Sequence, residues 1–203
     1  MIIYDIETEN AILGRSEVRQ PDIKYCDGWH DYAGMGISCI GVIDYASETT
    51  RIFLKDNLQS FAELIRSTNC IVGFNNHKFD NKLLMARGVP LPVGRSYDIL
   101  EEIWRGLGLP LEFDYKTHGG LSLDAMVKAN FGRSKTDSGA LAPVLWQRGE
   151  HGRVIDYCLA DVALTRMLLD RIIRRGELVD PRTGQKFSVR PPSPELNDET
   201  NKF

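Results

Sequence analysis

The sequence predicts a single α/β domain whose mixed five-stranded sheet is flanked by helices. Segment 1–7 is apolar on both faces, which is typical of a central strand that helices cover from both sides. Segments 36–44 and 49–55 have the composition of strands and are joined by a tight turn, so we expect them to pair antiparallel. With 203 residues, the chain is long enough to bury one sizeable core.

The other regular elements follow in chain order. The short apolar segment 70–75 and a second short segment, 95–99, complete the set of expected strands. Asn57 is a suitable N-cap for a helix that runs to about Ser67. The helix after segment 70–75 should end near Gly88, because glycine suits the position that closes a helix. Later helices are expected at 99–106, 121–131, 139–148 and 151–175.

Three segments lack a regular pattern. Segment 8–35 is polar with scattered glycine and proline, and its length for a loop in a compact domain indicates a functional or partly mobile region. The sequence DPRTG at 180–184 is a turn signal and predicts a small hairpin. Segment 190–203 is rich in proline and polar residues, so we expect it to be disordered.

The composition limits the class of protein. A content of 42% hydrophobic and 26% charged residues is ordinary for a globular protein, and no apolar run is long enough for a membrane helix. The chain starts with a strand-like segment instead of a signal peptide, and its four cysteines form no CxxC pair. Three of the cysteines lie in apolar segments, which favours buried free thiols over disulfides or zinc and fits a reducing cytoplasm. The net charge of −3 argues against a broad basic surface for duplex DNA, but permits an enzyme that grips a few nucleotides.

Carboxylates interrupt apolar segments at distant places in the chain, where an uncompensated charge is costly. Asp5 and Glu7 are two residues apart near the end of the first strand, so their side chains share a face. If segment 70–75 pairs parallel to the first strand, the two flank a switch point of the sheet, where open α/β sheets bind ligands. Asp80 follows segment 70–75 early in the next helix and is therefore placed near the same point.

A further carboxylate lies on the long helix near the end of the chain. Tyr157 and Asp161 are four residues apart and share a helix face that continues as Leu164 and Leu168. This apolar continuation should pack on the sheet, which directs Asp161 inward. Each acidic segment alone has an ordinary explanation as a surface pair or a helix cap. Together they predict one site whose converging carboxylates need divalent cations.

The same residues carry a resemblance to a known family. DIE at Asp5–Glu7, the pattern Asn75-x-x-x-Phe79-Asp80 and the pattern Tyr157-x-x-x-Asp161 resemble the three motifs of the DEDD superfamily. This DnaQ-like group of 3′–5′ exonucleases has a ribonuclease H-like fold, so the resemblance implies that fold here.

The branch and the extent of the resemblance can also be stated. Tyr157 matches the tyrosine (DEDDy) branch, since the histidine branch has its histidine five residues before the last aspartate, where this chain has Asp156. Segment 121–137 is similar to the region before the third motif in proofreading domains of family-B DNA polymerases. The resemblance covers residues 1–175 as the exonuclease domain, with 8–35 as an extended loop insertion. A C-terminal extension at 176–203 has no family counterpart.

The resemblance assigns the metal ligands and the residue that acts on water. It implies that Asp5, Glu7, Asp80 and Asp161 hold two Mg²⁺ or Mn²⁺ ions, with Asp5 bridging them. Tyr157 corresponds to the family tyrosine that orients the attacking water. An unperturbed tyrosine has a pKa of about 10 and is a poor base at neutral pH, so positioning is its expected role.

Substrate contacts are expected around these ligands. The resemblance implies that Asn75 and Phe79 contact the terminal nucleotides, although Phe79 could equally pack between helix and sheet. Thr8 is a candidate to hold the 3′-terminal nucleotide through its backbone, and Lys135 is a candidate phosphate contact. His77, beside the second motif, is expected on a helix surface. Basic and aromatic residues alternate in the loop insertion, namely Arg15, Arg19, Lys24, Tyr25, Trp29 and Tyr32.

That alternation suits single-strand binding by stacking and backbone contacts, but it is equally the pattern of a solvated loop with one or two aromatic residues packed on the domain. The leading hypothesis is a metal-dependent 3′–5′ exonuclease that acts on single-stranded or frayed DNA ends. An exoribonuclease of the same branch differs only in contacts to the 2′-hydroxyl, for which the sequence has no motif. A catalytically idle module that binds nucleic acid is the third reading, and the complete set of carboxylates argues against it.

Overall fold

The computed structural model describes residues 1–14, 17–91, 94–133 and 139–193. Its main sheet has five strands in the order β3-β2-β1-β4-β5. The strands are β1 (Ile2–Glu7), β2 (Cys39–Asp44), β3 (Thr50–Leu54), β4 (Ile71–Gly73) and β5 (Ser96–Asp98). β1 pairs antiparallel with β2 and parallel with β4, so the sheet is mixed. The predicted α/β class and mixed five-stranded sheet are confirmed.

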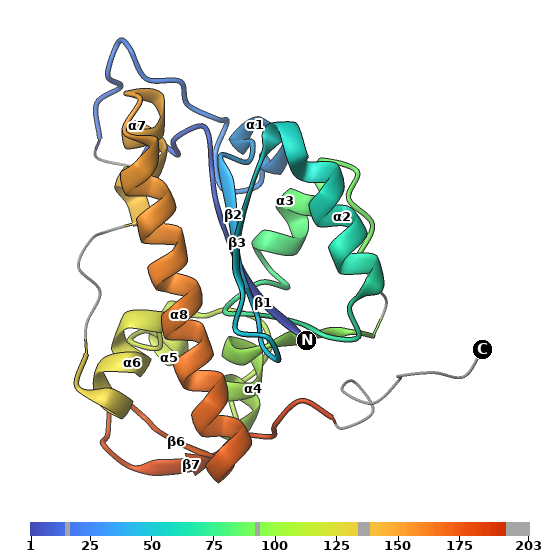
Figure 1. Ribbon diagram of the computed structural model, residues 1–203. Helices are drawn as coiled ribbons and strands as arrows, with labels where there is room; N and C mark the ends of the chain where they lie inside the picture. Colours follow the sequence, from blue (N-terminus) through green and yellow to red (C-terminus); the bar gives the residue numbers. More distant parts are fainter. Residues whose placement is uncertain (15–16, 92–93, 134–138, 194–203) are drawn as a thin grey trace.

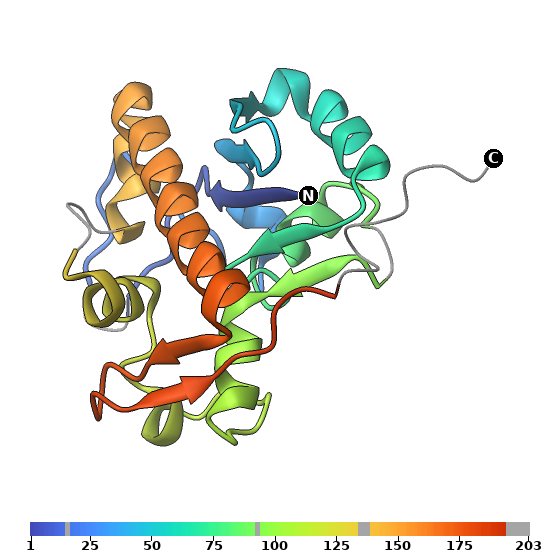
Figure 2. The same cartoon turned by 60° about the horizontal axis from the view of Figure 1, so that its bottom comes forward.

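Helices cover both faces of this sheet (Figure 1). They are α1 (Tyr32–Met35), α2 (Leu58–Ser67), α3 (Asp80–Ala86), α4 (Ile99–Gly106), α5 (Tyr115–His118), α6 (Leu123–Phe131), α7 (Ala142–Gln147) and α8 (His151–Arg175). Figure 2 shows α8 lying along one side of the sheet and α2 on the other. The helix predicted after segment 70–75 is α3, and its predicted end near Gly88 is confirmed, because Gly88 follows α3 with a φ of +71°.

Alternation along β1 divides the core into two halves. Ile2, Tyr4 and Ile6 are buried on the side of α2 and α3. Ile3 is buried on the opposite side, together with side chains of α4, α6 and α8. Because successive side chains of a strand point to opposite faces, Asp5 and Glu7 share the α8 side with Ile3. The strand that is apolar on both faces is therefore central, as predicted.

Close contact between α8 and the sheet depends on a glycine in β2. A Cβ atom added at Gly41 would lie 3.0 Å from the sulfur of Cys158 and 3.2 Å from a methyl group of Val162. The backbone N–H of Gly41 donates a hydrogen bond of 3.2 Å to the same sulfur. A larger side chain at this position would push away the helix that carries Tyr157 and Asp161.

The predicted hairpin is present after α8 and packs on the domain. β6 (Glu177–Val179) and β7 (Lys186–Ser188) pair antiparallel around the turn at 180–184. Leu178 is fully buried in the hydrophobic cluster on the α8 side. The Tyr97 hydroxyl donates a hydrogen bond of 2.6 Å to the carbonyl oxygen of Arg190. Residues 194–203, most of the tail expected to be disordered, lie outside the described residues.

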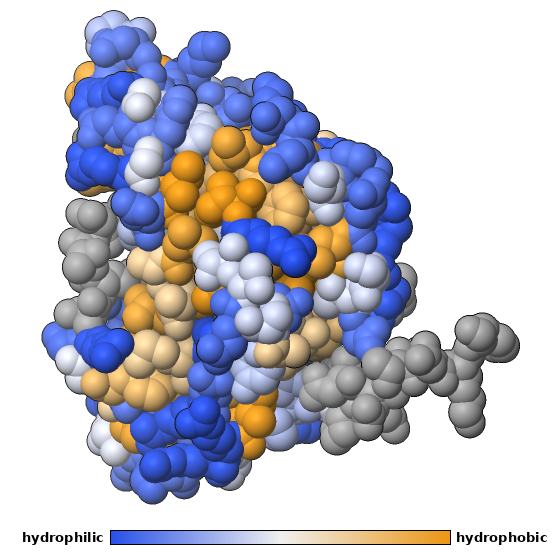
Figure 3. Space-filling model, in the orientation of Figure 1, coloured by the Kyte–Doolittle hydropathy of each residue, from blue (hydrophilic) through white to orange (hydrophobic). Residues whose placement is uncertain are grey.

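Surface and cysteines agree with the composition. In Figure 3, hydrophilic residues cover the periphery of the face shown, and hydrophobic residues gather in its middle, where Figure 1 places β2 and β3. All four cysteines are free and buried, as predicted. In the described part of the chain, no helix has the length and apolar character needed to span a bilayer.

Candidate metal centre

The last residues of β1 have no strand partner on the side of β4, and Asp80 hydrogen-bonds to the backbone there. The parallel pairing of β1 with β4 covers only Ile2 and Ile3, so the later N–H groups of β1 on that edge lack a strand partner. The carboxylate of Asp80 accepts a hydrogen bond of 3.0 Å from the backbone N–H of Ile6. Asp80 is the first residue of α3 and is 4% exposed. The strand that carries Asp5 and Glu7 is thus tied directly to Asp80.

Helix α8 brings the remaining residues to this point. Asp161 is 6% exposed, and the phenol of Tyr157 is hydrogen-bonded to its carboxylate. A Cβ atom added at Gly139 would lie 2.9 Å from the hydroxyl oxygen of Tyr157. Glycine at position 139 therefore leaves room for the phenol beside Asp161.

A cavity of about 470 Å³ joins these elements. All four predicted carboxylates line it, and so do the predicted substrate contacts Thr8, Asn75 and Phe79. The residues that line it are Asp5, Ile6, Glu7, Thr8, Ile12, Gly14, Glu17, Trp29, Phe74, Asn75, Phe79, Asp80, Gly139, Pro143 and Asp161. Tyr157 contacts Asp161 but does not itself line the cavity, and Lys135 lies outside the described residues.

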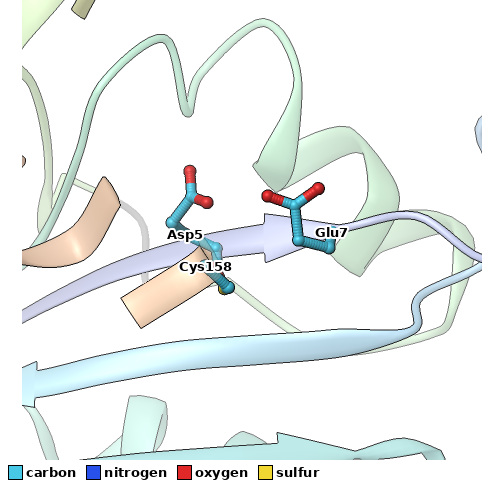
Figure 4. Close-up of side chains that lie close together, drawn as sticks. All are labelled: Asp5, Glu7 and Cys158. Atoms are coloured by element: carbon cyan, nitrogen blue, oxygen red, sulfur yellow. The ribbon is translucent and has the colours of Figure 1, made fainter. Parts of the chain in front are cut away.

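Two carboxylates of this wall lie close to a buried thiol of α8. Ligand atoms of Asp5, Glu7 and Cys158 lie within 4.8 Å of one another. Figure 4 shows both carboxylates on the same side of β1, with Cys158 close by. No role in this site was predicted for Cys158. The sequence indicated its position only indirectly, because Cys158 follows Tyr157 on a helix that was expected to pack on the sheet.

Burial, and after it the charge of neighbouring carboxylates, raises the pKa of two carboxyl groups in this wall. Burial, followed by the charges of Asp5, Asp161 and Asp80 among its neighbours, raises the pKa of Glu7 well above its usual range. Burial, with a contribution from Asp98, raises the pKa of Asp80 to about 7. Among the described residues, no lysine, arginine or histidine lines the cavity. A set of buried oxygen donors without cationic side chains fits hard divalent ions such as Mg²⁺ and Mn²⁺.

The turn that connects β4 to α3 is held in an uncommon conformation. Asn75 has a φ of +67°, in the left-handed region that asparagine tolerates better than most residues. The carboxylate of Asp98 accepts hydrogen bonds of 2.9 Å from the N–H of Asn75 and 3.0 Å from the N–H of His77. It also accepts one of 2.9 Å from Leu100 at the start of α4. Asp98 therefore holds the turn that presents Asn75 and Phe79 to the cavity.

Asp98 was missed in the sequence, although it stood between a predicted strand and a predicted helix, where aspartate is a favoured N-cap. The expectation for His77 was wrong. His77 lies in the turn before α3 and not on a helix surface. Its ring is within hydrogen-bonding distance of Glu101 (3.1 Å) and Ser96 (2.9 Å). These contacts place the ring of His77 against β5 and α4.

Replacing Asp98 with asparagine is expected to loosen this turn. One carboxylate oxygen becomes an amide N–H₂ group that cannot accept a hydrogen bond from a backbone N–H. We expect a loss of about 1–3 kcal/mol in the free energy of unfolding, measured by thermal and urea denaturation. Glu112→Gln, an exposed change in the loop before α5, is the matched control and should leave the unfolding free energy unaltered. Equal stability of Asp98→Asn and wild type would show that the hydrogen bonds to Asp98 do not hold the turn.

Comparison with known proteins supports the fold. No protein-family model and no curated protein matches the chain. Among solved structures, the chain is similar to the family B DNA polymerase from the hyperthermophilic archaeon Pyrobaculum calidifontis, with a TM-score of 0.55 and 17% sequence identity over 85% of this chain. The match spans 24% of the polymerase chain. At this identity the likeness concerns the fold, a mixed sheet with flanking helices that is consistent with the ribonuclease H-like fold.

Proposed function

We propose that this chain is a metal-dependent 3′–5′ exonuclease that hydrolyses phosphodiester bonds at single-stranded or frayed ends of DNA. The observation that carries the proposal is that four carboxylates line one cavity, namely those of Asp5, Glu7, Asp80 and Asp161. The phenol of Tyr157 is hydrogen-bonded to the last of them. The family resemblance of these same residues supplies the direction of cleavage and the DEDDy branch. We assign the catalytic unit to residues 1–175, because every proposed metal ligand lies in that range.

The carboxylates are the proposed ligands of two Mg²⁺ or Mn²⁺ ions. Such ions, when bound, lower the pKa of water and neutralise the charge that develops on the phosphoryl oxygens. Asp80 is fixed by its hydrogen bond to Ile6, and Asp161 by the packing of α8 on β2. These supports preorganise the ligands, so that binding of the ions requires little rearrangement.

Tyr157 is suited to orient water and unsuited to act as a base. Burial, followed by the charge of Asp161, raises the pKa of Tyr157 above its ordinary value. The phenol therefore keeps its proton at neutral pH and serves as a fixed hydrogen-bonding group beside the metal ligands. This agrees with the positioning role that the family resemblance implies.

The cavity also limits the substrate. Its volume of about 470 Å³ is in the range of sites that enclose one small ligand. A single unpaired nucleotide matches such a site, whereas a base-paired terminus must fray before it enters. Asn75, Phe79 and Thr8 lie in the wall where this nucleotide would be held.

The proposal is tested with 5′-labelled substrates. Single-stranded DNA, single-stranded RNA and a duplex with a 3′ mismatch are incubated with Mg²⁺, Mn²⁺ or EDTA and resolved on a denaturing gel. We expect a ladder that shortens from the 3′ end with either metal and is absent in EDTA. A ladder from RNA alone would identify the exoribonuclease. No cleavage of any substrate with either metal would favour an idle nucleic-acid-binding module.

Replacing Tyr157 with phenylalanine removes the phenol oxygen and keeps the ring. We expect kcat to fall by about tenfold to a hundredfold, because water is no longer oriented, while calorimetric titration with Mn²⁺ gives the affinity of the wild type. Tyr115→Phe, at a side chain that is 80% exposed, is the control. Unchanged kinetics in Tyr157→Phe would mean that Tyr157 only packs in the core.

A further inference from the structure

We propose that Trp29, on the loop insertion 8–35, stacks on an unpaired nucleobase beside the metal centre. This inference rests on the proposed function and adds a substrate contact that none of the sequence motifs contains. It assigns the loop insertion a direct role in holding single-stranded ends.

The first support is the position of Trp29. It lines the same cavity as the four carboxylates and is 66% exposed. The other two tryptophans pack within the domain. Trp104 is 1% exposed, and Trp146 packs against His151 with ring centroids 4.1 Å apart. A large aromatic side chain left exposed at the rim of a site, and not in the core, is suited to contact a ligand.

Trp29 is also part of an aromatic surface. Its ring centroid lies 6.3 Å from that of Phe79, which lines the cavity too. Tyr32 supports Phe79 from the side, with ring centroids 6.4 Å apart, and its hydroxyl donates a hydrogen bond of 3.2 Å to the carbonyl of Lys78. Phe79 therefore packs on the domain and also lines the cavity, while its contact with a nucleotide stays a prediction.

The loop that carries Trp29 is held at several points. The carboxylate of Asp31 accepts hydrogen bonds from the N–H groups of Asp27 (3.0 Å) and Gly34 (2.8 Å), on either side of Trp29. The side chain of Gln147, at the end of α7, accepts one from the N–H of Lys24 (2.7 Å). It also donates to the carbonyls of Glu9 (2.9 Å) and Lys24 (3.1 Å). Trp29 is thus presented by an anchored loop, and less entropy is lost when it binds.

The charge of the cavity explains why a base contact is needed. Five carboxylates line the wall, including Glu17, and no cationic side chain does so among the described residues. In the described part of that wall, no positively charged side chain is available to attract phosphate. Stacking on an aromatic ring is independent of charge and tolerates every base, so it can hold successive nucleotides as the end shortens.

The test compares Trp29→Ala, Trp29→Phe and wild type on single-stranded oligonucleotides with Mg²⁺. We expect Trp29→Ala to raise KM about tenfold with kcat changed less than about twofold, and Trp29→Phe to restore most of the loss. Tyr115→Ala is the matched control, since it removes another largely exposed aromatic ring, one that does not line the cavity. Circular dichroism checks that all variants keep the wild-type melting temperature.

Abasic substrates show whether the contact is to a base. One base is removed at the 3′-terminal, second or third nucleotide, and KM is measured for wild type and Trp29→Ala. At the position where Trp29 stacks, the two proteins should have equal KM. A tenfold difference that persists on every abasic substrate, or an unaltered KM of Trp29→Ala on intact DNA, would overturn the proposal.

A binding measurement separates this proposal from the proposed function. Fluorescence anisotropy of a labelled oligonucleotide with Mg²⁺ reports affinity whether or not the strand is cut. If wild type cuts no substrate but binds the oligonucleotide about tenfold more tightly than Trp29→Ala does, the nuclease proposal fails and the stacking proposal stands. Equal affinity of the two proteins would reject the stacking proposal, even if the nuclease activity is found.

Discussion

Replacing Asp5 or Asp161 with asparagine is expected to abolish metal-dependent hydrolysis. Both side chains line the cavity and keep their size in the variant, but lose the charge that a divalent ion requires. Losing a metal ligand removes several kcal/mol of transition-state stabilisation, which corresponds to a fall in kcat/KM of at least about a thousandfold. The rate is measured on single-stranded DNA with saturating Mg²⁺.

The control for these variants is Asp56→Asn, an exposed aspartate in the turn before α2 that takes no part in the cavity. It should keep the wild-type rate. The Asp5→Asn and Asp161→Asn variants should both retain the circular dichroism spectrum of the wild type, since each replacement relieves charge crowding. Near-full activity in either variant would contradict the assignment of Asp5 and Asp161 as metal ligands.

Asp80→Asn is expected to change activity and stability in opposite directions. Activity should fall by a similar factor, because a proposed ligand is lost. In EDTA at pH 8.5, however, we expect the free energy of unfolding to rise by up to about 4 kcal/mol, the amount that corresponds to the raised pKa of the buried Asp80 carboxyl group. The buried negative charge is gone, and the amide oxygen of asparagine can still accept the hydrogen bond from the N–H of Ile6.

The pH dependence of this gain follows from the pKa of Asp80. In the folded protein it is about 7, above its ordinary value of 3.8. As the pH rises between these values, the unfolded chain releases this proton before the folded protein does, so the folded state loses stability relative to the unfolded one. The extra stability of Asp80→Asn should therefore be near zero at pH 4 and complete above about pH 7.

Urea denaturation of both proteins at pH 4 and pH 8.5 in EDTA measures this difference. Addition of Mg²⁺ at pH 8.5 should stabilise the wild type more than Asp80→Asn, because the ion binds only the folded site. If Asp80→Asn is less stable than wild type at pH 8.5 in EDTA, the buried carboxylate of Asp80 does not destabilise the folded protein, which would contradict this prediction.

Much of the fold could be predicted because local patterns and global contacts agree. The strand 2–7 is apolar on both faces and does lie in the middle of the sheet. Asn57 does precede α2 as predicted, but its side chain accepts a hydrogen bond of 2.6 Å from the N–H of Leu54 and makes none to the helix. The sequence pattern therefore predicted where the helix begins. It did not predict the hydrogen-bond partner of the Asn57 side chain, which is set by the preceding turn.

In the candidate site, spacing predicted which carboxylates converge but not what supports them. The hydrogen bond from Ile6 to Asp80 exists only because β4 stops pairing after Ile3, and strand length is not encoded in a motif. The bonds to Asp98 and the neighbourhood of Cys158 join residues that are far apart in the chain. The contact of Trp29 with Phe79 depends on the path of a loop whose sequence has no periodic pattern. The sequence therefore showed that the loop contains aromatic residues, but not which residues they contact.

Gln147 has a consequence for protein engineering. Its side chain holds the loop insertion through three hydrogen bonds to Glu9 and Lys24, yet it belongs to α7, more than a hundred residues later in the chain. A graft of residues 8–35 onto another protein of the same fold would therefore transfer the segment without the side chain that holds it. A donor–recipient chimera needs a glutamine at the corresponding helix end, so the loop and this one distant side chain form a single transplantable module.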